Sequence, residues 1–196
     1  MASRLRFTRL LLVPVIALGL VSHHLHPEDS GWDRLMASAG LVLLVLAMGG
    51  RIWASAYLAG KKNRALVVEG PYSVVRNPLY LFSFLGFVGA GLAWESLTLA
   101  VLLALLFAVT HWPAVLAEEQ TLHALFGIEY ERYRRRVPRF VPRAGLLRPS
   151  DTLLVDGIRF QAALRDGLAI PLVFVVADLV EWAKLAGWVP VLIYLP

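Results

Sequence analysis

The sequence predicts an all-α fold, a polytopic integral membrane helical bundle of about five transmembrane helices. Of its 196 residues, 58% are hydrophobic and 17% are charged, whereas charged residues make up about a quarter of a typical soluble domain. The apolar residues fall into long runs separated by polar segments, a pattern typical of spanning helices. Because these helices must pack on one another in one small bundle, we predict a single domain over residues 1–196.

The basic residues set the expected orientation in the membrane. Sixteen of the nineteen Lys and Arg residues lie in the N-terminal tail, after the second apolar run or after the fourth, and the exceptions are Arg34, Arg51 and Lys184. By the positive-inside rule these three regions face the cytoplasm. We therefore expect a cytoplasmic N-terminus, in a bacterial inner membrane given the short chain. The net charge of +5 is expected to favour binding to membrane lipids and not to nucleic acid.

The first two apolar runs predict a short anchor helix and a full span. Residues 10–21 follow three arginines, as in a signal peptide, but no small-residue cleavage site follows them, which favours a retained helix. Residues 35–58 are long enough to cross a hydrocarbon core of about 30 Å. Arg51 lies inside this second run, where it either snorkels to the interface or faces inward as a functional charge.

Proline delimits the third and fourth helices. Pro78 suits the first turn of a helix, and Asn77 before it is pushed towards an extended conformation. The third helix is therefore expected from residue 78 to about 93, with a short turn into a fourth helix over about 97–117. The fourth helix continues, more polar, to about residue 135, because three prolines follow it.

The C-terminal segment, residues 150–196, predicts an amphipathic helix and a last apolar segment. Apolar positions alternate with charged ones over 152–164, as in a helix at the membrane interface. The apolar region 168–195 contains three ionisable residues. We expect it to form one tilted span with an internal ion pair, and a re-entrant hairpin is the alternative.

Two polar blocks flank the third and fourth helices. The first, Gly70 to Tyr80, reads GPYSVVRNPLY, and the second, Glu118 to Pro142, reads EEQTLHALFGIEYERYRRRVPRFVP. The short connection between the helices makes them antiparallel neighbours, so that both blocks reach the same face of the membrane. The blocks therefore predict a polar pocket on the cytoplasmic side, within a catalytic core at about residues 57–142.

These blocks resemble those of the isoprenylcysteine carboxyl methyltransferase and phospholipid N-methyltransferase superfamily of integral membrane enzymes. The family pattern is G-x-Y-x-x-x-R-H-P-x-Y, a helical hairpin, an acidic pair, F-G-x-x-Y-x-x-Y and a V-P segment, and it covers about residues 70–142 here. The resemblance implies a methyltransferase that uses S-adenosyl-L-methionine. Its acceptor would be hydrophobic or lipid-like, such as a prenylcysteine carboxylate or a phospholipid amine.

The resemblance also implies which residues contact the cofactor. Carried over by position, ten residues of the connector, the third helix and the fourth helix bind it: Arg64, Ala65, Leu66, Val67, Tyr72, Asn77, Pro78, Leu79, Tyr80 and Glu118. The residue types suit this role. The glutamate can accept hydrogen bonds from ribose hydroxyls or from the methionyl ammonium, and tyrosine rings can pair with the sulfonium.

Arg76 and Glu119 are the candidate catalytic residues. Methyl transfer mainly requires that nucleophile and methyl be held about 3 to 3.5 Å apart in a dry site. Where the family has His, this chain has Asn77, which cannot carry a proton, so Glu119 is the nearest base for an amine acceptor. Where the prenylcysteine enzymes have an Arg associated with substrate, this chain has Ala114, which favours a different acceptor.

Other interpretations of these patterns remain open. The acidic pair is also typical of a solvated helix end, and the tyrosines of an interfacial aromatic belt. The run RYRRRVPR at 132–139 indicates headgroup binding or a topology signal. Three histidines at 23–26 lack a carboxylate cage, and cysteine is absent, so we expect no metal. His111 is expected to be a packed or cofactor-adjacent residue and not a catalytic base.

Two other functions compete with methyl transfer. One is a non-catalytic membrane protein that keeps the pocket as a ligand-binding site or scaffold. The other is an NADPH-dependent membrane enzyme that resembles sterol reductases, although 196 residues do not provide the additional helices that enclose a sterol.

Overall fold

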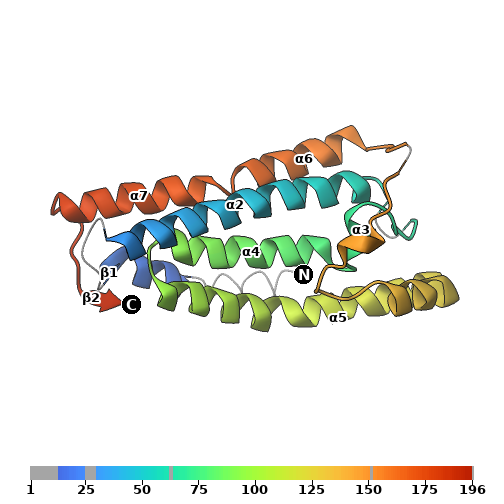
Figure 1. Cartoon of the computed structure of the whole chain (residues 1–196), viewed down its shortest axis with the longest axis horizontal. Helices are drawn as coiled ribbons and strands as arrows, with labels where there is room; N and C mark the ends of the chain where they lie inside the picture. The colour runs from blue at the N-terminus through green and yellow to red at the C-terminus, as the bar shows by residue number, and fades with distance from the viewer. Residues whose placement is uncertain (1–12, 25–29, 62–63, 151, 196) are drawn as a thin grey trace. The chain divides into compact units, whose positions relative to one another are not determined.

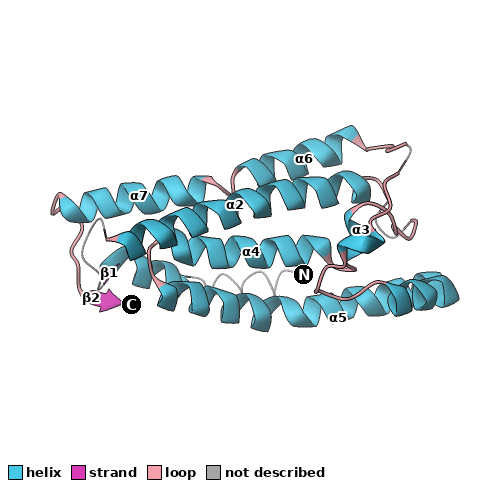
Figure 2. Ribbon diagram, in the orientation of Figure 1, coloured by secondary structure: helices cyan, strands magenta, loops and turns pink. Residues whose placement is uncertain are grey.

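The computed structural model describes residues 13–24, 30–61, 64–150 and 152–195. This part of the chain is built from helices, with one pair of short strands (Figures 1 and 2). Residues 13–21 are helical, in agreement with the expected anchor. The basic N-terminal tail and His26 lie outside the described residues. The elements that follow are β1 (Ser22–His24), α2 (Gly31–Leu58), α3 (Pro71–Val74), α4 (Pro78–Ala93), α5 (Leu97–Arg136), η1 (Ala144–Leu146), α6 (Gly157–Leu168), α7 (Leu172–Leu185) and β2 (Ile193–Leu195).

The helix lengths confirm an all-α, membrane-type fold. Among the described helices, α2 and α5 are long and apolar enough to cross a membrane, and α4 is a shorter apolar helix of 16 residues. A full span needs about 20 residues, so α4 and the 14 residues of α7 fall short of one. The described residues thus include two helices that satisfy the length requirement and further, shorter apolar helices.

The third and fourth helices have the predicted boundaries, with one addition. Helix α4 begins at Pro78 and ends at Ala93, and α5 continues to Arg136. At Gly127 the backbone of α5 leaves the helical region, with φ 50° and ψ −119°. Residues with a side chain rarely adopt a positive φ, so glycine permits a bend here that the helical pattern did not predict.

The C-terminal segment differs from both expectations for it. The amphipathic helix lies at α6, a few residues later than predicted, and α7 is only 14 residues long. At about 1.5 Å per residue, α7 is roughly 21 Å long, which is shorter than a hydrocarbon core of about 30 Å. Strand β2 follows and pairs in parallel with β1, with Ser22 opposite Ile193. The segment is thus a short helix and a strand, instead of one tilted span or a re-entrant hairpin.

The chain forms two compact units. Unit 1 comprises residues 1–46, 84–110 and 169–196, and unit 2 comprises residues 47–83 and 111–168. The single domain stays a prediction, since α2, α4 and α5 each contribute residues to both units.

Small residues bring the helices of unit 1 close together. A Cβ added at Gly40 would lie 2.6 Å from the backbone N of Ala93, and one at Gly91 would lie 2.2 Å from the Cα of Ala100. Both distances are far below van der Waals contact, so larger residues at these positions would push the helices apart. Gly40 of α2 and Gly91 of α4 thus permit the close approach of these helices.

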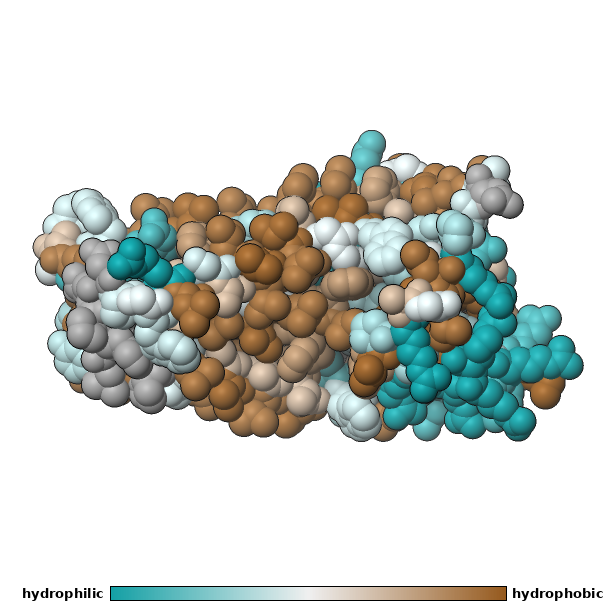
Figure 3. Space-filling model, in the orientation of Figure 1, coloured by the Kyte–Doolittle hydropathy of each residue, from teal (hydrophilic) through white to brown (hydrophobic). Residues whose placement is uncertain are grey.

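Apolar side chains also point outward from unit 1. Along α5, Leu97, Val101, Leu105 and Val109 recur every four residues and are each at least half exposed. In unit 2, by contrast, hydrophilic residues gather over the last turns of α5 (Figure 3). The exposed apolar stripe along α5 in unit 1 suits contact with lipid.

Candidate functional site

Gly70 determines how the chain enters the first polar block, in unit 2. Its φ is 56°, and an added Cβ would lie 2.4 Å from the Tyr57 ring. The Gly70 N–H donates to the Arg148 carbonyl at 2.7 Å. Ser73 Oγ donates to the Gly70 carbonyl at 2.6 Å and accepts from the Arg148 N–H at 2.9 Å. These contacts hold α3 in place, directly before the residues that enter the site.

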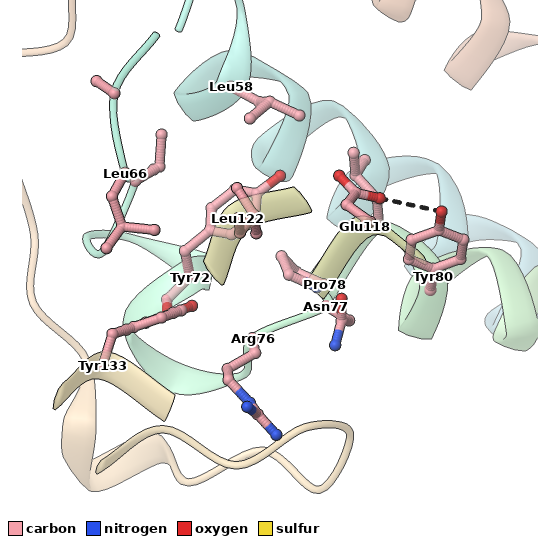
Figure 4. Close-up of a pocket in the computed structure, with 13 residues that line it drawn as sticks. Leu58, Leu66, Tyr72, Arg76, Asn77, Pro78, Tyr80, Glu118, Leu122 and Tyr133 are labelled. Carbon is pink, nitrogen blue, oxygen red and sulfur yellow. Dashed lines mark hydrogen bonds between the residues drawn. The ribbon is translucent and has the colours of Figure 1, made fainter. Parts of the chain in front are cut away.

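A cavity of about 60 Å³ lies in unit 2, bordered by the connector, α3, the start of α4, and α5. Its walls include nine of the ten residues expected to contact the cofactor, and Arg76 (Figure 4). Arg64 is the exception, because it is exposed and does not line the cavity. The full lining is Leu58, Ala65, Leu66, Val67, Tyr72, Arg76, Asn77, Pro78, Leu79, Tyr80, Glu118, Leu122 and Tyr133.

Three of the lining residues were not named from the sequence as cofactor contacts or catalytic residues. Leu122 lies four residues after Glu118 and therefore on the same face of α5. Tyr133 belongs to the second polar block, and its Oη donates to the Tyr72 carbonyl at 2.7 Å. Leu58 ends α2 and carries no motif signal. Helical spacing would have found Leu122, whereas only the tertiary structure finds Leu58.

The predicted cofactor residues Tyr80 and Glu118 contact each other. Tyr80 Oη donates to Glu118 Oε2 at 3.0 Å, which joins α4 to α5 (Figure 4). His111 packs edge-on against the Tyr80 ring, with centroids 6.3 Å apart. His111 is thus packed against a residue of the cavity wall, which agrees with the first of the two expectations for it.

Tyr72 presents a polar group that no other described residue satisfies. Its side chain is buried, and its Oη has no hydrogen-bond partner within the described chain. Burial, and secondly the nearby Glu118 carboxylate, raises the pKa of the Tyr72 phenol. The hydroxyl therefore stays protonated and can donate a hydrogen bond into the cavity.

Glu119 lies outside this cavity, in a buried polar network. Its carboxylate accepts from Asn77 Nδ2 at 3.0 Å and from Arg139 Nε and Nη2 at 3.1 and 2.7 Å. Arg76 Nη2 is 3.8 Å from the same carboxylate. The hydrogen bonds to Glu119 also raise the pKa of Arg139. A carboxylate that faces two guanidinium groups is a poor base, so this geometry suits a positioning role better than proton abstraction.

Arg76 keeps donors for a further partner. It lines the cavity, and its Nε and Nη1 atoms are buried without a hydrogen-bond partner among the described residues. Unsatisfied buried guanidinium donors are costly. A ligand carboxylate at this point would satisfy them.

Arg51 in α2 faces into unit 2. Its Nη1 donates to the Ser83 hydroxyl of α4. Of the two interpretations offered by the sequence, the inward-facing charge therefore agrees with the structure.

The residues fit S-adenosylmethionine in chemistry. The Tyr72 hydroxyl and Arg76 offer unused donors, and Glu118 offers acceptors. The volume of this cavity, about 60 Å³, is smaller than that of typical ligand sites, which is about 300–1,000 Å³. The cavity would therefore have to widen to admit a ligand of nucleotide size. No group of three His, Asp or Glu residues that could hold a metal ion occurs within the described ranges.

Comparison with known proteins identifies one matching family model and several similar proteins. The family model described as phospholipid methyltransferase matches residues 36–129. The nickel-cobalt-cadmium resistance protein NccN of Alcaligenes xylosoxydans xylosoxydans is 37% identical over 186 residues, which cover 95% of this chain and 87% of NccN. The cobalt-zinc-cadmium resistance protein CzcN of Cupriavidus metallidurans is 35% identical over 158 residues, which cover 81% of this chain and 73% of CzcN.

A shorter part of the chain is similar to an enzyme. The protein-S-isoprenylcysteine O-methyltransferase of Schizosaccharomyces pombe is 31% identical over 87 residues, which cover 43% of this chain and 37% of the enzyme. No solved structure matches the chain. The chain belongs to the family of NccN and CzcN, within the isoprenylcysteine and phospholipid methyltransferase superfamily of membrane proteins.

Proposed function

We propose that the chain is a membrane enzyme that transfers a methyl group from S-adenosylmethionine to a hydrophobic or lipid-like acceptor at the cytoplasmic interface. The observation that carries this proposal is the convergence of nine of the ten expected cofactor contacts on one cavity. These nine residues come from the connector, α3, the start of α4, and α5. Membership of the superfamily supports the reaction class.

The lining residues divide into three roles. When bound, S-adenosylmethionine supplies an activated methyl group. Arg76 and the Tyr72 hydroxyl would hold its carboxylate or other acceptor atoms, and Glu118 would accept from its hydroxyl or ammonium groups. The apolar side chains of Leu58, Leu66 and Leu122 would exclude water from the reacting atoms.

Glu119 acts in this scheme as a positioning residue. By holding the Asn77 amide and facing the Arg76 guanidinium, it orients two groups of the cavity wall. A carboxylate or thiolate acceptor needs no base, so methyl transfer to either is compatible with a fully engaged Glu119. An amine acceptor would have to lose its proton elsewhere.

The biological role of the reaction is proposed from NccN and CzcN, which this chain matches over most of their length. NccN and CzcN are named for resistance to nickel, cobalt, zinc and cadmium. We propose that methyl transfer by this chain serves metal resistance in a bacterial inner membrane. The test is growth in these metals of a strain that carries either the wild-type chain or Glu118→Gln. Loss of resistance with the variant supports the link to the site, and full resistance contradicts it.

Calorimetric titration tests the cofactor proposal. S-adenosylmethionine, S-adenosylhomocysteine and NADPH are titrated into detergent-purified protein and into a Tyr80→Ala, Glu118→Ala double variant. We expect the first two to bind to the wild type and to lose binding in the double variant, because it removes two polar walls of the cavity. Glu129→Ala, at an exposed position of α5, is the matched control.

Two outcomes contradict the proposal. Binding of NADPH alone supports the reductase alternative, and absence of all binding supports a non-catalytic protein. The helical circular dichroism of the double variant must equal that of the wild type. If it does not, Tyr80→Phe, which removes only the hydroxyl, replaces the double variant.

A further inference from the structure

A second and larger cavity lies in unit 2, where α5 bends. Its volume is about 410 Å³. We name it the α5 cleft, and its polar walls are Glu119, Gln120, His123, Tyr130, Arg134 and Arg139. None of these residues lines the cavity proposed for the cofactor. From the sequence, Glu119 was a candidate catalytic residue, and Arg134 and Arg139 belong to the run RYRRRVPR. The cleft therefore requires an explanation of its own.

The bend at Gly127 creates the cleft. Residues on either side of it contact one another, since the His123 and Tyr130 rings are perpendicular with centroids 6.3 Å apart. The ion pair between Glu119 and Arg139, at 2.7 Å, joins the two sides again. Polar side chains of the straight part of α5 thus face those that follow the bend.

The cleft and its rim have an excess of positive charge. Glu119 pairs with Arg139 and lies near Arg76, and Glu131, which does not line the cleft, pairs with Arg134 at 2.9 Å. Three arginines therefore face two carboxylates, which leaves a net charge of +1. The Arg134 side chain is 48% exposed, so it can reach a ligand without leaving a buried environment.

Tyr130 supplies an independent indication of a ligand. The residue is 2% exposed, and its hydroxyl has no hydrogen-bond partner within the described chain. A buried hydroxyl without a partner is costly, and native structures rarely keep one. A ligand oxygen in the cleft would provide the partner.

We propose that the α5 cleft binds the phosphate group of a membrane lipid, through Arg134, Arg139 and the Tyr130 hydroxyl. Arginine forks and a hydroxyl match the several oxygens of a phosphate better than the two of a carboxylate. The volume exceeds that of a phosphate alone and leaves room for a headgroup. Leu125 and Ile128 at the bend are 52% and 66% exposed, so apolar side chains for the lipid lie beside the charged cleft.

This inference does not rest on methyl transfer, since the cleft shares no lining residue with the cofactor cavity. It replaces the general headgroup interpretation of the run RYRRRVPR with two specific members, Arg134 and Arg139. The other arginines of that run do not line the cleft. A matched pair of variants can therefore separate a site from a diffuse positive surface.

The test compares Arg134→Gln with Arg135→Gln in detergent-purified full-length protein. Both variants remove one positive charge from neighbouring exposed positions, but only Arg134 lines the cleft. Short-chain phosphatidylglycerol is titrated calorimetrically in an uncharged detergent. We expect Arg134→Gln to weaken binding roughly three- to tenfold, as befits a partly exposed charge-assisted hydrogen bond. Arg135→Gln should bind like the wild type.

Tyr130→Phe provides a second readout. Because the hydroxyl has no partner in the free protein, its removal should weaken lipid binding without lowering the midpoint of unfolding. A hydroxyl with a purely structural role would give the opposite result, with lower stability and unchanged affinity. That result would overturn the assignment.

Further titrations identify the source of the phosphate. Binding of inorganic phosphate or glycerol 3-phosphate with the same dependence on Arg134 supports a phosphate site and shows that free phosphate can fill it. Binding of the lipid alone supports a headgroup site. Equal weakening by the two arginine variants, or no binding by the wild type, overturns the proposal. Binding of S-adenosylmethionine, measured in parallel, keeps this outcome separate from that of the cofactor proposal.

Discussion

The two units of the chain accommodate their buried carboxylates by different means. In unit 2, Glu119 is ionised between Arg139, Arg76 and the Asn77 amide. In unit 1, the Glu95 carboxyl group instead lies near two other acids, Asp33 and Glu181. Burial, followed by the charges of Glu181 and Asp33, raises the pKa of Glu95 to about 8. One unit therefore pairs its acid with cations, and the other keeps a proton on it.

The comparison extends to the basic residues. Lys184 in unit 1 donates to the Gly19 and Ser22 carbonyls and lies over the Trp94 ring, 5.3 Å from its centroid. In unit 2, Arg76 retains two buried donors with no partner among the described residues. Unit 2 thus combines buried charge with unsatisfied donors beside a cavity, which is the combination expected of a ligand site.

Removing the central carboxylate of unit 2 should have the largest effect on stability. Glu119→Ala leaves Arg139 and Arg76 without their carboxylate and Asn77 without its acceptor. We expect a loss of about 2–4 kcal/mol in the free energy of unfolding, below the full cost of breaking a buried pair because Arg139 is one-third exposed. Denaturant titration in detergent measures it.

Glu129→Ala, at an exposed position of the same helix, is the control and should change stability little. If the two variants are equally stable, the Glu119 network is not the main electrostatic contact of unit 2.

Gly70→Ala should have a somewhat smaller effect, through the backbone. The new Cβ would meet the Tyr57 ring at 2.4 Å, at a φ of 56°. We expect about 1–3 kcal/mol of destabilisation from steric overlap and an unfavourable φ. Weaker binding of S-adenosylmethionine should follow, since Gly70 holds α3 and Tyr72 beside the cavity.

Gly145→Ala is the matched comparison for this variant. A Cβ at Gly145 would meet nothing within 4 Å, and its φ is not positive. Thermal unfolding followed by circular dichroism should therefore separate the two alanines. Equal midpoints would contradict the role assigned to Gly70.

The smallest effect should be a change in pH dependence in unit 1. Because the pKa of Glu95 rises from 4.5 to about 8 on folding, its contribution to stability is fully present below pH 4.5. That contribution is lost as pH rises through about 8. Glutamine resembles the protonated acid, so in Glu95→Gln the midpoint of unfolding should fall less steeply as pH rises over this range. Glu129→Gln should keep the slope of the wild type, and an unchanged slope in Glu95→Gln would show that another group titrates.

The sequence predicted those features that depend on neighbouring residues. Pro78 and the preceding Asn77 predicted where α4 begins. The two polar blocks were predicted to lie on the same face of the membrane, and Tyr80 of one block is hydrogen-bonded to Glu118 of the other at 3.0 Å. Nine of the ten residues that motif positions named as cofactor contacts line one cavity, and Arg64 is the exception. Local rules of this kind work because a helix start and an i, i+4 face are set within a few residues.

Some predictions were wrong or incomplete where partners are distant in the chain. The parallel pairing of Ser22 with Ile193, and the bidentate contact of Arg139 with Glu119, have no local signal. The two guanidinium neighbours of Glu119 are likewise not visible in the spacing of the acidic pair, and its role as a base stays a prediction.

By itself, the sequence determined the helical membrane fold, the order of its helices and the identity of most residues around the 60 Å³ cavity. Apolar run length and short-range motifs carry that information directly. Only the tertiary structure decided which buried charges are paired, where α5 bends, and that a second cavity opens at the bend. These features depend on contacts between residues far apart in the chain, and the free energy of such contacts is not encoded in local periodicity.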